Sequence, residues 1–95
     1  SSYQENTVVR VMDAVMNYQP DWVIQQGKKR AHKIIIPAKA RYYDAVVCWL
    51  KKVKQAYQAA ARSDQWENFL VQLRQQHKPK HKLMDLLDKT FGEAS

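Results

Sequence analysis

The sequence predicts an all-α protein, an antiparallel stack of α-α hairpins with about five helices, and three observations lead to that prediction. The 95 residues include two glycines and three prolines, which are too few turn residues for an all-β domain. Apolar side chains recur at intervals of three and four residues in five segments, the period of a helix with one buried face. Proline or a capping residue separates these segments. We treat residues 1–95 as a single helical domain.

The first two helices are expected at residues 3–18 and 20–35. The first carries Val8, Val11, Met12, Val15 and Met16 on one face, and the second carries Trp22, Val23, Ala31, Ile34 and Ile35. The first should end before Pro20, because proline disfavours the α conformation of the residue that precedes it. Pro20 then opens the second helix, where its missing N–H costs no hydrogen bond. Gly27 lies in mid-helix, and we interpret it as a point where another helix approaches closely.

The third helix, residues 38–60, has the strongest pattern in the chain. Its apolar face comprises Tyr43, Val46, Val47, Leu50, Val53, Ala56, Tyr57 and Ala60. Trp49 flanks this face, and we expect it to pack rather than bind a ligand. Cys48 is expected to be a buried or half-buried structural thiol. Asp44 is expected to pair with Arg41 or Lys51.

A fourth helix is expected at residues 64–77 and a fifth at residues 80–91. Their apolar faces comprise Trp66, Phe69, Leu70 and Leu73, then Leu83, Met84, Leu86, Leu87 and Phe91. Ser63 or Asp64 should cap the fourth helix, with Asp64 and Glu67 spaced as a capping box. The basic run 77–82 separates the two helices, and Gly92 should end the last one. The hairpin of residues 40–77 is the predicted structural centre.

The charge distribution predicts an acidic partner. The net charge is +7, and nine of the sixteen Lys and Arg residues lie between Lys28 and Lys54, where Asp44 is the only acid. Such an asymmetry favours an acidic protein surface or a nucleic acid, while the alternative is a solvated face that keeps the protein soluble. The candidate partner-binding residues are Lys28, Lys29, Lys33, Lys51, Lys52 and Lys54.

No group of residues predicts catalysis or a cofactor. The one cysteine excludes an intramolecular disulfide and any multi-cysteine zinc site within this chain. His77 and His81 are four residues apart, but Pro79 should break the helix that would align them on a metal. No glycine-rich phosphate loop is present. No apolar run approaches the ~20 residues of a membrane span, and no signal peptide precedes the first helix, so we expect a cytoplasmic protein without membrane contact.

Four blocks of residues 8–88 resemble the C-terminal helical region of bacterial SWIM-type zinc-finger proteins. These are PDWVI, ARYYDAVVCWLKKVKQAY, RSDQWENFLVQL and HKPKHKLMDLL, in that order. The resemblance implies a tetratricopeptide-like arrangement and a fragment of a longer chain, with zinc bound only in an upstream region. One departure is Ala61, which stands where the family pattern has a glycine; alanine there implies a different turn or about 1 kcal/mol of strain.

Two functional hypotheses follow. The first is a non-catalytic scaffold that holds a partner helix or peptide in a groove formed by the first three helices, with Lys29, Lys51, Lys52 and Lys54 contacting an acidic partner. The second is an accessory nucleic-acid-binding domain that uses the basic faces of the second and third helices, with Tyr42, Tyr43 and Trp49 nearby. A homodimer through the first or the fifth helix is a further alternative.

Overall fold

The computed structural model describes the backbone of residues 2–93 and the side chains of residues 6–93, and within these residues it is all-α. The elements are α1 (Ser2–Val15), α2 (Pro20–Ile35), the 3-10 helix η1 (Ala40–Tyr42), α3 (Tyr43–Ala59), α4 (Ser63–Gln76) and α5 (His81–Phe91). The predicted fold class is therefore confirmed. Among the described residues, no helix is both long and apolar enough to cross a membrane.

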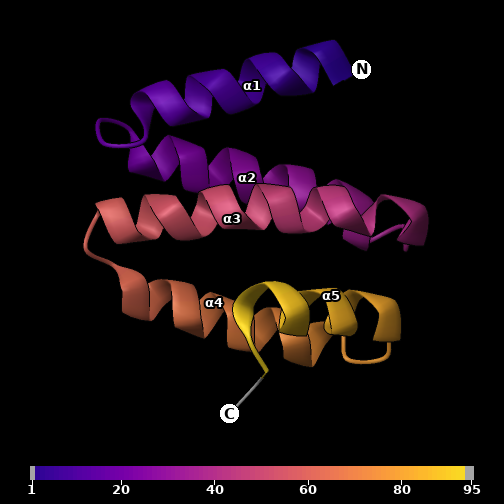
Figure 1. Ribbon diagram of the computed structural model, residues 1–95. Helices are drawn as coiled ribbons and strands as arrows, with labels where there is room; N and C mark the ends of the chain where they lie inside the picture. The colour runs from indigo at the N-terminus through magenta and orange to yellow at the C-terminus, as the bar shows by residue number, and fades with distance from the viewer. Residues whose placement is uncertain (1, 94–95) are drawn as a thin grey trace.

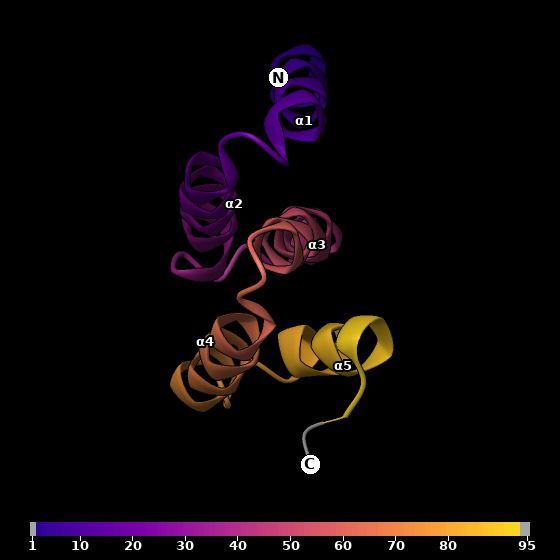
Figure 2. The same cartoon turned by 90° about the vertical axis from the view of Figure 1, so that its left-hand side faces the viewer.

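The helices form three layers (Figures 1 and 2). The first layer is α1 alone, the second is the antiparallel pair α2 and α3, and the third contains α4 and α5. The contact between α2 and α3 is the most extensive in the molecule, while α1 has far less contact with the pair. The long helix α3 lies at the centre, because it also contacts α4 and α5.

Gly27 determines how closely α2 and α3 approach each other. A Cβ at this position would overlap Cγ2 of Val53 and lie 3.2 Å from the carbonyl oxygen of Trp49. The interpretation of Gly27 as a point of close approach is therefore confirmed. The lower helix propensity of glycine, a cost of about 1 kcal/mol, is offset by the packing of two backbones that no larger residue would permit.

The core is built around α3 and is thin at α1. Eight buried side chains come from α3: Tyr43, Val46, Val47, Trp49, Leu50, Val53, Ala56 and Tyr57. From below, α4 and α5 add Trp66, Leu70, Leu73, Leu83 and Leu87. Among the described side chains of α1, Met12 alone is fully buried, and Val8, Val9 and Val15 are partly buried. The first layer therefore depends on few contacts.

Two helix ends differ from the sequence prediction by more than one residue. The first helix ends at Val15 rather than residue 18, because the N–H groups of Tyr18 and Gln19 both donate to the Val15 carbonyl in a turn. The third α-helix begins at Tyr43 rather than residue 38, because Ala38 has a φ of 57° and a 3-10 turn follows it.

The ends of α2 and α3 share one motif, with an alanine in the left-handed conformation. After α3, Ala61 has a φ of 56°, its N–H donates to the Gln58 carbonyl, and the Arg62 N–H donates to the Tyr57 carbonyl. This is the Schellman pattern, which usually places glycine at the left-handed position. After α2, Ala38 has a φ of 57°, its N–H donates to the Ile35 carbonyl, and the Lys39 N–H donates to the Ile34 carbonyl. Alanine at Ala61 therefore keeps the turn and adds strain.

Two arginines hold the start of α4 and the end of α5 in place. The residue that precedes α4 is Arg62, and no side chain caps this helix, so the predicted capping box of Asp64 and Glu67 is wrong. Arg62 instead pairs with Asp21 of α2. At the other end, Gly92 has a φ of 87° and ends α5 as predicted. Arg74 of α4 holds that end, donating to Asp88 Oδ1 and to the Gly92 carbonyl, both at 2.7 Å.

The strain at Ala61 can be measured. We expect Ala61→Gly to raise the free energy of unfolding by about 0.5–1 kcal/mol, because the relief of left-handed strain exceeds the added entropy of the unfolded chain. Urea denaturation followed by circular dichroism gives the value. The control is Ala59→Gly, at the exposed last residue of α3, where the backbone is still helical and glycine should lower stability. A decrease for Ala61→Gly would contradict the left-handed turn.

Candidate functional site

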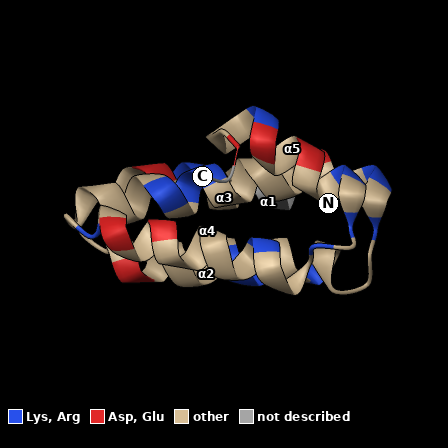
Figure 3. Cartoon of the chain, turned by 90° about the horizontal axis from the view of Figure 1, so that it is seen from below, with Lys and Arg blue, Asp and Glu red and all other residues tan. Residues whose placement is uncertain are grey.

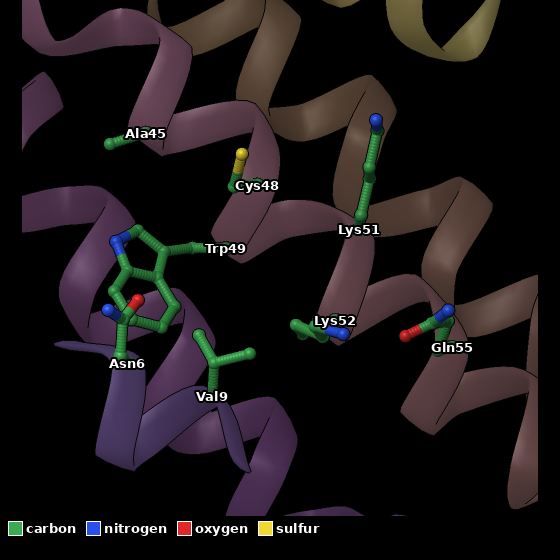
Figure 4. Close-up of a pocket in the computed structure, with 8 residues that line it drawn as sticks. All are labelled: Asn6, Val9, Ala45, Cys48, Trp49, Lys51, Lys52 and Gln55. Atoms are coloured by element: carbon green, nitrogen blue, oxygen red, sulfur yellow. The ribbon is translucent and has the colours of Figure 1, made fainter. Parts of the chain in front are cut away.

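A groove lies between α1 and α3 (Figure 4). Asn6 and Val9 of α1 form one wall, and the other residues come from α3: Ala45, Cys48, Trp49, Lys51, Lys52 and Gln55. Its volume is about 460 Å³. The groove exists because α1 lies above α3 without interlocking with it along its whole length.

The floor of the groove is apolar and firmly supported. Trp49 is 5% exposed, so its packing role is confirmed, and the Arg30 guanidinium of α2 lies 5.2 Å from the centre of its ring. Ala45 lies one turn before Trp49 and leaves the space that makes the hollow. Cys48 is exposed and lines the groove, so the prediction of a buried thiol is wrong. The groove therefore offers an apolar surface with a thiol and amides at its edge.

The charge at the rim comes from two lysines in different states. Lys51 is exposed and points away from Val9 (Figure 4). Lys52 forms an ion pair of 2.7 Å with Asp13, which connects α3 to α1 across the groove. Asp44 takes part in none of the ion pairs between the described side chains, so its predicted pairing with Arg41 or Lys51 is not observed. Among the described side chains, Lys51 is thus the lysine of the rim that makes no ion pair.

The six predicted partner-binding lysines do not form one surface. Gly27 of α2 and Val53 of α3 face each other, and Lys29 and Lys51 each lie two residues away from them. Two residues correspond to a rotation of about 200° around a helix, so Lys29 and Lys51 point away from the shared interface in opposite directions. Lys33 lies one turn after Lys29 on the same side and is likewise exposed.

Two of the six lysines contact aromatic rings of the fold. Lys28 is half-buried, its Nζ donates to Tyr57 Oη at 2.8 Å, and it lies 4.3 Å from the centre of the Phe69 ring. This contact connects α2 to α3 and α4, so the Lys28 ammonium is engaged within the fold. Lys54 is also half-buried, with its Nζ 5.7 Å from the centre of the Phe91 ring.

The aromatic residues of the nucleic-acid hypothesis divide into two groups. Tyr43 and Trp49 are 3% and 5% exposed, so neither presents a face on which a base could stack. Tyr42 is 48% exposed, and the Arg41 guanidinium lies 5.1 Å from the centre of its ring. The basic faces of α2 and α3 therefore lack stacking partners, whereas the turn between these helices has one.

His77 is a buried histidine at the end of α4, where the basic run 77–82 begins. It is 6% exposed, and its Nδ1 has no hydrogen-bond partner. Burial, with the nearby positive charges of Lys80 and His32, lowers the pKa of His77 below its ordinary value of 6.5. Within the described residues, no group of three or more His, Cys, Asp or Glu side chains could hold a metal ion.

The groove itself was not predicted as a set of residues. The sequence indicates a groove among the first three helices but does not identify Asn6, Val9, Ala45 or Gln55. One signal was available: Ala45 and Trp49 are a small and a large residue one turn apart at the edge of the apolar face of α3. The position of α1 decides whether that edge is open.

Comparison of the chain with models of known protein families, with curated proteins and with solved structures finds no match. The resemblance to SWIM-type zinc-finger proteins therefore stays a prediction.

The internal role of Lys28 predicts a difference between neighbouring lysines. Lys28→Met should lower the free energy of unfolding by about 1–2 kcal/mol, because Tyr57 Oη loses its donor and Phe69 its cation. Lys29→Met, at an exposed position, should change it by less than about 0.5 kcal/mol. Equilibrium denaturation of both variants measures the difference. Equal effects would contradict the structural role of Lys28.

The environment of His77 predicts loss of stability in weak acid. Because the pKa of His77 is lowered in the folded state, the unfolded chain binds more protons below its pKa of 6.5, and stability falls as the pH decreases through that value. Denaturation between about pH 7.5 and 5.5 should show a smaller loss for His77→Gln than for the unmodified protein. His81→Gln, at an exposed position, is the control and should retain the full loss.

Proposed function

We propose that this protein is a non-catalytic interaction module that binds a peptide or an amphipathic helix of a partner in the groove between α1 and α3. The observation that carries the proposal is the groove that Val9 of α1 forms with Ala45 and Trp49 of α3. Helical proteins commonly bind amphipathic helices in such grooves, where one or two apolar side chains supply most of the affinity.

The chemistry of the rim indicates the partner's composition. Lys51 is free to pair with a carboxylate, and Lys52 is available to a partner that competes with Asp13. Asn6 and Gln55 add amides that form hydrogen bonds to a peptide backbone. The preferred ligand is therefore a segment with an apolar anchor flanked by Asp or Glu, in agreement with the acidic partner predicted from the charge distribution.

The lining residues support binding rather than catalysis. The thiol of Cys48 could in principle be a nucleophile, but none of the described lining residues is a histidine or a carboxylate that would act as its base. The resemblance to the tail of SWIM-type zinc-finger proteins supports the same reading. In that reading the helical layers are a tetratricopeptide-like scaffold that attaches a larger zinc-binding protein to its partner.

Selection from a displayed library of random peptides tests this function. We expect selected peptides to combine apolar residues at helical spacing with Asp or Glu, and to protect Cys48 from alkylation by a maleimide. Lys51→Glu should weaken their binding roughly three- to tenfold, because an attractive charge becomes repulsive.

The matched control is Lys29→Glu, which changes the net charge equally on the far side of α2 and should leave peptide binding unchanged. Peptides that bind without protecting Cys48, or that respond equally to Lys29→Glu and Lys51→Glu, would contradict the groove as the binding site.

A further inference from the structure

A second surface lies at the end of the molecule where α2 passes into α3 and α4 passes into α5. It carries six cations, which we call the basic end: Lys33, Lys39, Arg41, Lys78, Lys80 and Lys82. Figure 3 shows Lys and Arg gathered at the α4–α5 loop and the start of α5, whereas acidic segments of α2 and α4 lie at the opposite end. His77 follows α4 directly, and it lies close enough to His32 near the end of α2 for their charges to interact. The two connections are therefore neighbours in space.

The cations of the basic end are free to bind a ligand. The ion pairs among the described side chains use Lys52, Arg62 and Arg74, and none of these belongs to the basic end. The helix α5, which begins here, has no acidic residue in its first turn, so its amide dipole adds to the positive potential, whereas α3 has Asp44 in its first turn. All six side chains except that of Lys80 are exposed. The end therefore presents an excess of positive charge from two separate turns.

An exposed aromatic ring lies within this charge. Tyr42 is 48% exposed, and the guanidinium of Arg41 covers one side of it. A tyrosine flanked by cations is the arrangement on which proteins stack the bases of a single strand while neutralising its phosphates. The groove between α1 and α3 includes no residue of the basic end, so the two surfaces are separate.

We propose that the basic end binds single-stranded nucleic acid, with a base stacked on Tyr42 and the phosphate chain running across Lys39 and Arg41 toward the lysines of the α4–α5 loop. This surface is separate from the peptide groove, and of the predicted partner-binding lysines on the basic helix faces it includes only Lys33. Charge from two turns, rather than one helix face, creates it.

Fluorescence anisotropy with labelled oligothymidine and oligouridine of about 15 nucleotides tests the proposal. We expect both to bind at low salt, with an affinity that falls as salt rises by about 0.7 in the logarithmic slope for each phosphate neutralised. The two strands tell whether a 2′-hydroxyl contributes. No binding of either strand at low salt would overturn the proposal.

Two sets of variants separate the basic end from net charge. The combination Lys78→Glu, Lys80→Glu and Lys82→Glu should lower affinity at least tenfold and reduce the salt slope by about two. The matched combination Arg10→Glu, Lys29→Glu and Lys89→Glu makes the same change in net charge at exposed positions elsewhere, and should lower affinity less than threefold. Equal losses in the two sets would overturn the proposal. Circular dichroism establishes that each variant is folded.

Tyr42 has a distinct signature. Tyr42→Ala should lower affinity about fivefold or more with the salt slope unchanged, and Tyr42→Phe should retain it, because stacking needs the ring and not the hydroxyl. Unchanged affinity in Tyr42→Ala would overturn the stacking site. Polyglutamate and vesicles of anionic lipid serve as other polyanions. If either binds more tightly than the oligonucleotides at equal salt, the surface belongs to that partner and the proposal fails.

Discussion

The close contact of α2 and α3 at Gly27 is the constraint on which the rest of the structure depends. With no side chain at this position, the α2 backbone lies against Val53 and the Trp49 carbonyl. Overpacking at such a contact costs typically 1–3 kcal/mol, a large share of the roughly 5–15 kcal/mol that stabilises a domain. Because α3 is held along this line, its remaining sides become the surfaces that receive α1 above and α4 with α5 below. The groove, the thin first layer and the well-packed third layer all follow from this pair.

The sequence predicted the helices well because helical periodicity is a local property. The bounds of α2 were predicted from Pro20 and the apolar spacing alone, and the packing of Trp49 followed from its place beside the apolar face of α3. The turns were harder, since their conformations are determined by where the next helix must go. Nothing local to Ala38 requires a left-handed residue there, and alanine disfavours one. The prediction of a capping box failed for the same reason: Arg62 is oriented by Asp21, which is 41 residues away.

The candidate site was less predictable than the fold, because a pattern shows which residues are polar but not what covers them. Lys28 reads as a solvated residue, yet its ammonium lies between rings of α3 and α4. Cys48 reads as core, yet it opens into the groove because α1 leaves that strip of α3 uncovered. The lysines of α2 and α3 belong to one basic part of the sequence, but they point in different directions once the two helices pack. The basic end, in contrast, gathers cations from two connections that are far apart in the sequence.

The weak attachment of α1 determines in what fraction of molecules the groove is present. Among the described side chains of α1, Met12 is fully buried, Val8, Val9 and Val15 are partly buried, and the ion pair of Asp13 with Lys52 adds one link to α3. Segments with so few buried contacts open at a lower free energy than the whole domain, so α1 is the part of the fold that separates first. The groove is then a conditional site, present only in the closed fraction of molecules. A ligand that contacts both α1 and α3 shifts that equilibrium toward the closed state, and its apparent affinity is lowered in proportion to the fraction of molecules that are closed without it. Slow amide exchange in α1 then becomes a measure of the occupancy of the groove.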